Sequence, residues 1–248
     1  GSIGMRHANI LKDMGLEVTF FSKRSDLTFP KINSLLSINL DKFSYVIIAN
    51  ESSKHYLTLK KISQNVKDKI ILIENPLFVK KKHFPLNISE NKCFVGYNLR
   101  FHPLIQKLKN TLLNEEIINI ELNCSQFLPD WNPWRDYRDT YSAKISLGGG
   151  VLKDISHEID LLYFFLNKGT IKFYSTKYLK LSNLEIETND YYRASGLFNA
   201  TFFSISLDYI SKIPRRNILV YTNNKTIYAD LLSGELKVSS DINEEKYS

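Results

Sequence analysis

Gly1-Ser-Ile-Gly-Met-Arg-His-Ala-Asn-Ile-Leu11 opens the chain and has the pattern of a glycine-rich loop that runs into a helix. A complete dinucleotide-binding fingerprint has a buried strand and three glycines, which serve the tight turn, the approach of the pyrophosphate and the packing of the helix. Gly1 and Gly4 match the second and third glycines, so we expect the domain to lack its first strand. Alternatively, Gly1-Ser2 is a cloning remnant and Gly4 belongs to an ordinary turn. The residues expected to contact phosphate are Gly1, Ser2, Ile3 and Gly4.

The first half of the chain alternates short apolar runs with helical patterns. Apolar residues at helical spacing predict a helix over 4–14, which Gly15 ends. Strand-like runs follow at 16–21, 45–49 and 69–73, and a helical pattern separates the last two. Continuous apolar strands separated by helices are typical of a parallel sheet with both faces covered.

The pattern changes after Asn98. Several strand-like stretches follow one another from Lys172 onward with little helix between them, which predicts a mostly antiparallel sheet. The elements predicted before those strands are a helix over 101–113, an alternating strand over 118–124 and a helix from the glycine run at 148–150 to about 167. The fold class predicted is therefore α/β plus α+β, with an incomplete Rossmann domain over 1–98 and a substrate domain over 99–248.

Composition places this chain of 248 residues, 43% of them hydrophobic, among ordinary soluble proteins of one or two domains. No apolar run approaches the length of a membrane span, and no leader pattern is visible. Cys93 and Cys124 lie in strand-like runs, where a thiol behaves as a small hydrophobe. We therefore expect a cytoplasmic protein without a membrane partner.

The formal net charge of +7 raises the possibility of nucleic-acid binding. The lysines are, however, spread along the chain and interleaved with acids, and the tightest cluster, Lys80-Lys81-Lys82, lies in a predicted loop. We expect no nucleic-acid partner. A basic surface instead favours an anionic small molecule such as a nucleotide sugar.

The end of the second strand of a dinucleotide-binding domain selects the cofactor. An acidic residue there binds the ribose 2′-hydroxyl of NAD, whereas cationic and hydroxyl side chains accept the 2′-phosphate of NADP. Ser22, Lys23 and Arg24 occupy this place, so the sequence favours NADP over NAD. Asp26 is close enough to keep NAD open, and a plain basic turn is the alternative.

The helix after the glycine run carries the strongest catalytic candidates. One face of this helix is apolar, with residues at helical spacing: Ile155, Ile159, Leu162 and Leu166. At 100° per residue, Asp154, His157 and Asp160 fall on the opposite side. A histidine between two carboxylates suits a general base for hydroxyl oxidation, and an exposed helix face is the alternative. A metal site from Asp154, His157 and Glu158 is disfavoured, so no metal is predicted.

An aromatic loop and a nearby arginine are candidates for substrate contact. Trp131, Trp134 and Tyr137 lie within seven residues of one another, where their rings could stack on a sugar or base. Packing of the loop over the sheet explains the same residues equally well. Asn98 and Arg100 stand at the predicted domain junction, where the arginine could pair with a carboxylate or a phosphate.

In this order, the segments resemble the glucose-fructose oxidoreductase, inositol dehydrogenase and rhizopine-catabolism (Gfo/Idh/MocA) family over nearly the whole chain. The opening loop with its His-Ala resembles the family's glycine loop, and 49–55 resembles its Ala-Thr-Pro and His loop beside the nicotinamide. Residues 74–76 stand where the family has Glu-Lys-Pro, and 149–160 resembles its Gly-Gly, Asp, His, Asp helix. The further cofactor contacts that the resemblance implies are Ala49, Asn50, His55 and Glu74.

The family resemblance implies hydride exchange between a sugar carbon and a nicotinamide, with a lysine and a histidine handling the hydroxyl proton. It implies a sugar or nucleotide-sugar substrate, held by Asn98, Arg100, Trp131, Trp134, Tyr137 and Asp160. A likeness to a subgroup points to bacterial surface-polysaccharide or nonulosonic-acid biosynthesis. The open sheet of the substrate domain implies a homo-oligomer.

Two departures from the family pattern bear on activity. Asn75 replaces the motif lysine, and an amide cannot exchange that proton at neutral pH. The spacing from Asp154 to His157 is one residue shorter than in many members, which leaves open whether His157 or Glu158 meets the substrate. The predicted catalytic set is His157, Asp154 and Asn75, and the alternative function is a catalytically impaired binding or assembly subunit.

Overall fold

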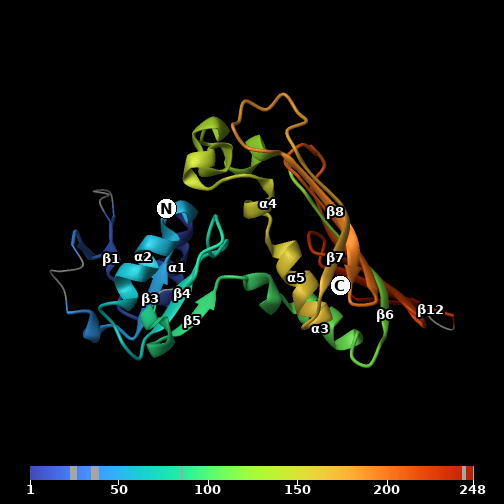
Figure 1. The fold of residues 1–248 in the computed structure, drawn as a ribbon, viewed down its shortest axis with the longest axis horizontal. Helices are drawn as coiled ribbons and strands as arrows, with labels where there is room; N and C mark the ends of the chain where they lie inside the picture. The colour runs from blue at the N-terminus through green and yellow to red at the C-terminus, as the bar shows by residue number, and fades with distance from the viewer. Residues whose placement is uncertain (23–26, 35–38, 85, 242–243, 248) are drawn as a thin grey trace. The chain divides into compact units, whose positions relative to one another are not determined.

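The computed structural model describes residues 1–22, 27–34, 39–84, 86–241 and 244–247. The chain divides into two compact units, Gly1–Gly96 and Tyr97–Ser248 (Figure 1). Each unit has its own hydrophobic core.

The first unit contains two small parallel sheets. Strands β1 (Phe20–Phe21) and β2 (Lys31–Ile32) pair with each other, and β3 (Tyr45–Ile48), β4 (Ile70–Ile73) and β5 (Lys92–Val95) form the other sheet in that order. Every pairing is parallel, which confirms the predicted Rossmann-like arrangement. The core beside the larger sheet comprises Ile48, Leu59, Ile62, Val66, Ile71 and Ile73.

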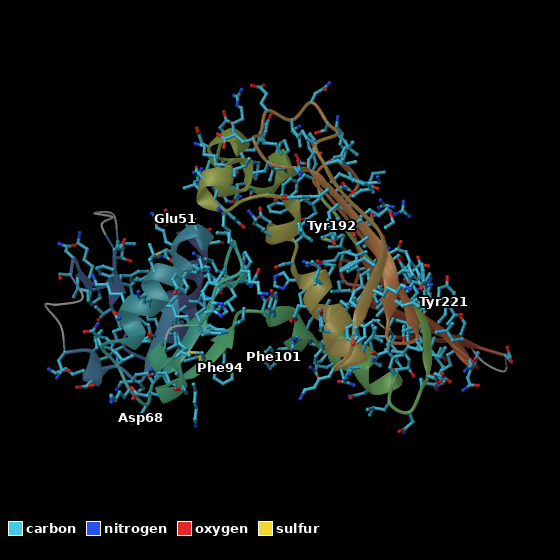
Figure 2. All side chains as sticks on the ribbon, viewed as in Figure 1. Glu51, Asp68, Phe94, Phe101, Tyr192 and Tyr221 are labelled. Carbon is cyan, nitrogen blue, oxygen red and sulfur yellow. The ribbon has the colours of Figure 1, made fainter. Side chains whose placement is uncertain are left out.

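The helices of this unit are α1 (Ser2–Asp13) and α2 (His55–Ser63). Gly15 follows α1 with φ of +78°, a conformation that glycine adopts without strain, so the predicted stop signal is confirmed. The strand predicted over 16–21 is shorter than expected, because only its last two residues have a partner strand, and that partner is itself two residues long. In Figure 2 Asp68 marks the turn that precedes β4, where its φ is +57°.

The second unit is built on an eight-stranded sheet with the order β13-β12-β11-β10-β6-β9-β8-β7. Strands β6 and β9 are parallel and every other neighbouring pair is antiparallel, which confirms the predicted sheet type. The strands are β6 (Ile117–Ser125), β7 (Ile171–Leu179), β8 (Tyr191–Phe198), β9 (Thr201–Asp208), β10 (Arg215–Thr222), β11 (Lys225–Asp230), β12 (Glu235–Ser240) and β13 (Glu244–Tyr247).

Helices cover one face of this sheet. They are α3 (Pro103–Thr111), α4 (Val151–Asp154) and α5 (His157–Leu166), and Figure 1 shows α3 and α5 on the same side of the strands. Alternate residues of the central strands are buried on that side, as period-two patterning requires. Figure 2 labels one residue of each face: Tyr192 of β8 on the covered side and Tyr221 of β10 on the open side.

An ion pair fastens α5 to the covered face of the sheet. The Nε of Arg216, on β10, donates to Oε1 of Glu158 at 2.7 Å, and Glu158 is only 2% exposed. Burial raises the pKa of Glu158 even though Arg216 opposes the shift. A carboxylate in such a position depends on its partner, because the buried charge has no water to replace it.

We predict that Arg216→Met destabilises the protein by about 3–5 kcal/mol, because it leaves the Glu158 carboxylate buried without a counter-charge. The double variant Glu158→Met with Arg216→Met should recover most of that loss, since it removes both charges. Urea denaturation at neutral pH would measure both. A single variant no less stable than the double variant would show that the charge pair does not hold the helix.

Candidate active site

The N-terminus of α1 has the features of a phosphate cradle. Gly1 is the N-cap and makes no side-chain cap, the first turn contains no acidic residue, and the first intrahelical bond runs from Met5 N to Gly1 O at 3.2 Å. The earlier N–H groups of the turn therefore have no partner within the helix. With the helix dipole, they form a site that suits an anion.

Gly4 brings this helix end close to the sheets. A Cβ on Gly4 would lie 3.7 Å from Cβ of Ala49, just after β3, and 3.9 Å from the ring of Phe20 on β1. These are ordinary van der Waals distances, so the helix start packs against the carboxyl ends of both strands. The predicted contacts Gly1, Ser2, Ile3, Gly4 and Ala49 therefore fit a dinucleotide pyrophosphate at the place where parallel α/β sheets bind it.

Glu74 is held in place at the end of β4. Its Oε1 lies 2.5 Å from Nε2 of His7 on α1, and its backbone N donates to Ile48 O on β3. A Cβ on Gly96 would stand 3.1 Å from both Glu74 oxygens, so this glycine makes room for the carboxylate. His7 is a contact that the sequence reasoning missed, and the His-Ala after the glycine loop is the signal that could have suggested it.

Asn75 is anchored to the backbone of the neighbouring strand end. Its Nδ2 donates to Gly96 O at 2.8 Å. Asn75 therefore helps to fix the loop that contains Glu74, and its expected role of orienting without exchanging protons stays a prediction.

His55 acts as a clamp between two loops of the first unit. The residue is 1% exposed; its Nδ1 lies 3.0 Å from Pro76 O and its Nε2 lies 3.0 Å from Asn50 O. Since both ring nitrogens contact backbone carbonyls, His55 positions the segment at Asn50 relative to the segment after Glu74. Its predicted contact with the cofactor is thus an indirect one in this arrangement.

Ser22 follows β1, and its backbone N donates to Ile32 O at 3.3 Å. This places it at the carboxyl end of the strand, as the cofactor prediction requires. Lys23 and Arg24, the other two residues of that prediction, lie outside the described residues.

The predicted helix over 151–167 is interrupted, and this changes its geometry. α4 ends at Asp154, Ile155 takes φ −104° and ψ 41°, and α5 begins at His157. The helical rotation used to place Asp154 beside His157 therefore does not apply. The alternative of an exposed helix face is also wrong, because Glu158 and Asp160 are both buried.

The carboxylates of this segment each bind a different partner instead of flanking His157. Asp154 accepts a 2.5 Å hydrogen bond from the Tyr209 hydroxyl, and Asp160 forms a bidentate pair with Arg100. Glu158 pairs with Arg216 as described above. The structure thus corrects the interpretation that Asp154 and Asp160 support the imidazole.

Asp154 lies in a buried pocket of hydroxyl groups. Burial raises the pKa of Asp154 to about 6, while hydrogen bonds from Ser142, Tyr209 and Tyr141 oppose the shift. The glycine run is needed for this packing: Gly150 has φ of +116°, and a Cβ there would come within 2.6 Å of the Tyr178 hydroxyl. The glycine run, which the sequence analysis placed at the start of a helix, therefore also allows tyrosines to approach the carboxyl group.

His157 is half-buried at the start of α5 and packs against Tyr97. The two rings meet edge to face with centroids 5.8 Å apart, and burial raises the pKa of Tyr97. Tyr209, which bonds Asp154, was not among the predicted site residues. It is distant in sequence from the helix, so no local pattern indicates it.

Arg100 and Asp160, both predicted to bind substrate, bind each other. The Nε of Arg100 donates to Oδ2 of Asp160 at 2.7 Å, and the side chains are 40% and 8% exposed. The guanidinium also lies over the ring of Phe164. Asn98 is exposed in the turn that leads to this pair.

The aromatic loop is split by the fold. The Trp131 ring packs edge to face on Tyr209 with centroids 5.3 Å apart, whereas Trp134 is 81% exposed. The Tyr137 hydroxyl accepts a hydrogen bond from Glu185 N. Packing within the second unit therefore accounts in part for the presence of Trp131 and Tyr137 in this loop. Of the two, Trp131 is the one that contacts Tyr209 and, through it, Asp154.

Among the described residues, no group of histidine, cysteine, aspartate or glutamate side chains is arranged to hold a metal ion. In the same part of the chain, no helix has both the length and the apolar character needed to cross a membrane.

Neither a scan against protein-family models nor a search of curated proteins found a match for this chain. Solved structures do share its fold. A protein from Desulfitobacterium hafniense, provisionally assigned as an NADPH-dependent oxidoreductase, aligns with TM-score 0.74 and 16% identity over 89% of this chain and 69% of its own.

Two further structures come from nucleotide-sugar enzymes. UDP-N-acetylglucosamine 3-dehydrogenase GnnA from Acidithiobacillus ferrooxidans has TM-score 0.71 and 15% identity over 97% of this chain and 70% of its own. The WlbA dehydrogenase from Bordetella pertussis, in complex with NADH and UDP-GlcNAcA, has TM-score 0.72 and 15% identity over 93% and 75%. At these identities the comparison establishes the fold, and it confirms the predicted two-domain fold of the sugar-dehydrogenase family.

The pKa of Asp154 gives a testable pH dependence. A carboxyl whose pKa rises from 3.8 to about 6 on folding stabilises the protein fully below the lower value, and this contribution is lost as pH rises through the upper one. We predict that the unfolding free energy of the native protein minus that of Asp154→Asn falls by roughly 2 kcal/mol between about pH 4 and about pH 7. Denaturant titrations across this range would measure it, and a constant difference would contradict it.

Proposed function

We propose that this chain, which has the two-domain fold of the Gfo/Idh/MocA dehydrogenases, is a nicotinamide-dependent oxidoreductase that acts on a sugar or nucleotide sugar. The observation that carries the proposal is the start of α1, where Gly4 packs against Ala49 and the ring of Phe20 and the first turn presents free N–H groups. The fold shared with GnnA and WlbA supports the same class of reaction.

The first unit holds the cofactor in this proposal. The N–H groups of Gly1 to Gly4 bind the pyrophosphate of the cofactor. Glu74, fixed by His7, offers a carboxylate to the ribose hydroxyls of the cofactor. A bound nicotinamide supplies the hydride acceptor or donor for a sugar carbon. Ser22-Lys23-Arg24 favours NADP over NAD through the 2′-phosphate.

The second unit holds the substrate and handles the proton. A ring nitrogen of His157 takes the proton of the sugar hydroxyl, while the sugar carbon that bears this hydroxyl gives up a hydride to the nicotinamide. Tyr97 fixes the plane of the imidazole ring. Arg100, Asp160 and Trp131 shape the surroundings. Since Asn75 cannot share the proton transfer, His157 must carry it alone, which favours a slow enzyme.

The alternative is a catalytically impaired member that binds nucleotide sugars or serves as an assembly subunit. Asn75 is the residue that favours it, because the amide is tied to Gly96 O and lacks the chemistry of the family lysine. Both versions place the protein in the cytoplasm, in surface-polysaccharide or nonulosonic-acid synthesis. Both also use the open sheet face, with Leu219, Tyr221 and Phe202, for a homo-oligomer.

A charge at the start of α1 tests cofactor binding. Ser2→Glu adds a carboxylate that suits the helix dipole, so stability should stay the same or rise by about 0.3–1 kcal/mol. The same charge repels a pyrophosphate, and we expect the Kd for NADPH to rise at least about tenfold. Calorimetric titration would measure this, with Asn9→Glu on the exposed side of the same helix as the control. Equal Kd values for both variants would refute the phosphate site.

Two substitutions separate the enzyme from the impaired subunit. His157→Gln should lower kcat by about 100-fold or more with little change in the Kd for cofactor, because it removes the proton acceptor. Asn75→Lys should raise kcat if the lost lysine limits turnover. Steady-state reduction of NADP with candidate nucleotide sugars would measure both. A His157→Gln protein of undiminished activity would exclude the assigned role.

A further inference from the structure

The second unit contains a cavity that shares only Trp131 with the site proposed above. It has a volume of about 510 Å³ and lies where the end of β6 meets the connection between β9 and β10. The residues that give it chemical character are Gln126, Phe127, Asp130, Trp131, Asn132 and Lys212. A space of this size accommodates a small ligand.

Two aromatic rings and one cation shape the cavity. Phe127 and Trp131 line it, and the ammonium of Lys212 lies 5.5 Å from the centroid of the Phe127 ring. This contact holds the lysine head beside an aromatic surface. Aromatic rings offer an apolar face on which the C–H face of a pyranose can stack, while the polar groups at the rim orient its hydroxyls.

The polar groups are balanced in charge and rich in both donors and acceptors. Asp130 and Lys212 are the charged residues of the lining, so their formal charges cancel. The amides of Gln126 and Asn132 each provide donors and an acceptor. The charged side chains of this lining give no excess of cations, which a phosphate site built on side chains requires. The lining instead matches a neutral polyhydroxylated ligand.

Trp131 gives a second indication. Its indole N–H is buried and has no hydrogen-bond partner among the described residues. A buried donor without an acceptor costs free energy, and a ligand hydroxyl is the kind of acceptor it lacks.

We propose that this cavity is a binding subsite for a neutral pyranose, such as an N-acetylhexosamine, that contains Trp131 and lies apart from His157 itself. It is joined to them through packing, because Trp131 contacts Tyr209 and the Tyr209 hydroxyl donates to Asp154. The inference rests on the proposed sugar substrate class and requires neither cofactor nor hydride transfer. The subsite would hold a sugar unit apart from the one that reacts.

The chain offers a direct probe, because it has only two tryptophans, Trp131 in the cavity wall and Trp134 at the exposed surface. Trp134→Phe leaves Trp131 as the single reporter. We expect N-acetylglucosamine, added to the full chain without cofactor, to change the Trp131 emission in a saturable way. Inorganic phosphate and UMP at the same concentrations should give no saturable change.

Two variants in the Trp134→Phe background locate the binding. Asp130→Ala removes a rim acceptor and should weaken sugar binding at least about fivefold, corresponding to the loss of one hydrogen bond to a charged group. Asp139→Ala removes another exposed carboxylate of the same segment, outside the lining, and should leave the affinity unchanged. Circular dichroism would show that both variants are folded.

Three results would overturn the subsite: no saturable response to any neutral sugar, a response to phosphate or UMP instead, or equal losses for Asp130→Ala and Asp139→Ala. These results are separable from a failure of the proposed function. If NADPH binds and turnover occurs while sugar binding to this cavity is absent, the subsite falls and the oxidoreductase stands. If sugar binds to this cavity and NADPH does not bind to the protein, the subsite stands and the proposed oxidoreductase is refuted.

Discussion

The buried pair between Arg216 and Glu158 is the constraint on which the second unit depends. Glu158 follows His157 directly, so the interaction that holds α5 to β10 also fixes the direction in which the imidazole leaves the helix. Breaking this pair costs free energy because it leaves a buried charge without a partner, and this cost keeps α5 in one position along the sheet. Two residues further along α5, Asp160 forms a bidentate pair with Arg100 of the turn Asn98–Phe101.

In the described part of the first unit, two histidines hold the segments that follow the strands in position. His55 reaches backbone carbonyls of two loops, and His7 meets Glu74 across the end of the sheet. Both contacts tie together segments that follow neighbouring parallel strands. The start of α1, the loop after β3 and the loop after β4 are therefore held at the same edge of the sheet, which is where such sheets bind nucleotides.

The groups proposed to hold the cofactor lie in the first unit, and the group proposed to take the proton lies in the second. Asn75 is bonded to the backbone carbonyl of Gly96, whereas His157 packs against the ring of Tyr97, which fixes the imidazole. Asp154 lies in a cluster of tyrosines, where burial raises its pKa to about 6. A helix break at Ile155 and Ser156 separates Asp154 from His157.

The sequence by itself determined the parallel and antiparallel sheets, the glycine loop and the family of folds, because these follow from local periodicity and from motifs read in order. It also identified His157 and Asn75 as candidate catalytic residues and Glu74 as a candidate cofactor contact. Only the tertiary structure decided that Asp154 binds Tyr209 and that Arg100 binds Asp160. Those partners lie 55 and 60 residues apart, and helical periodicity says nothing about which distant side chain neutralises a buried charge.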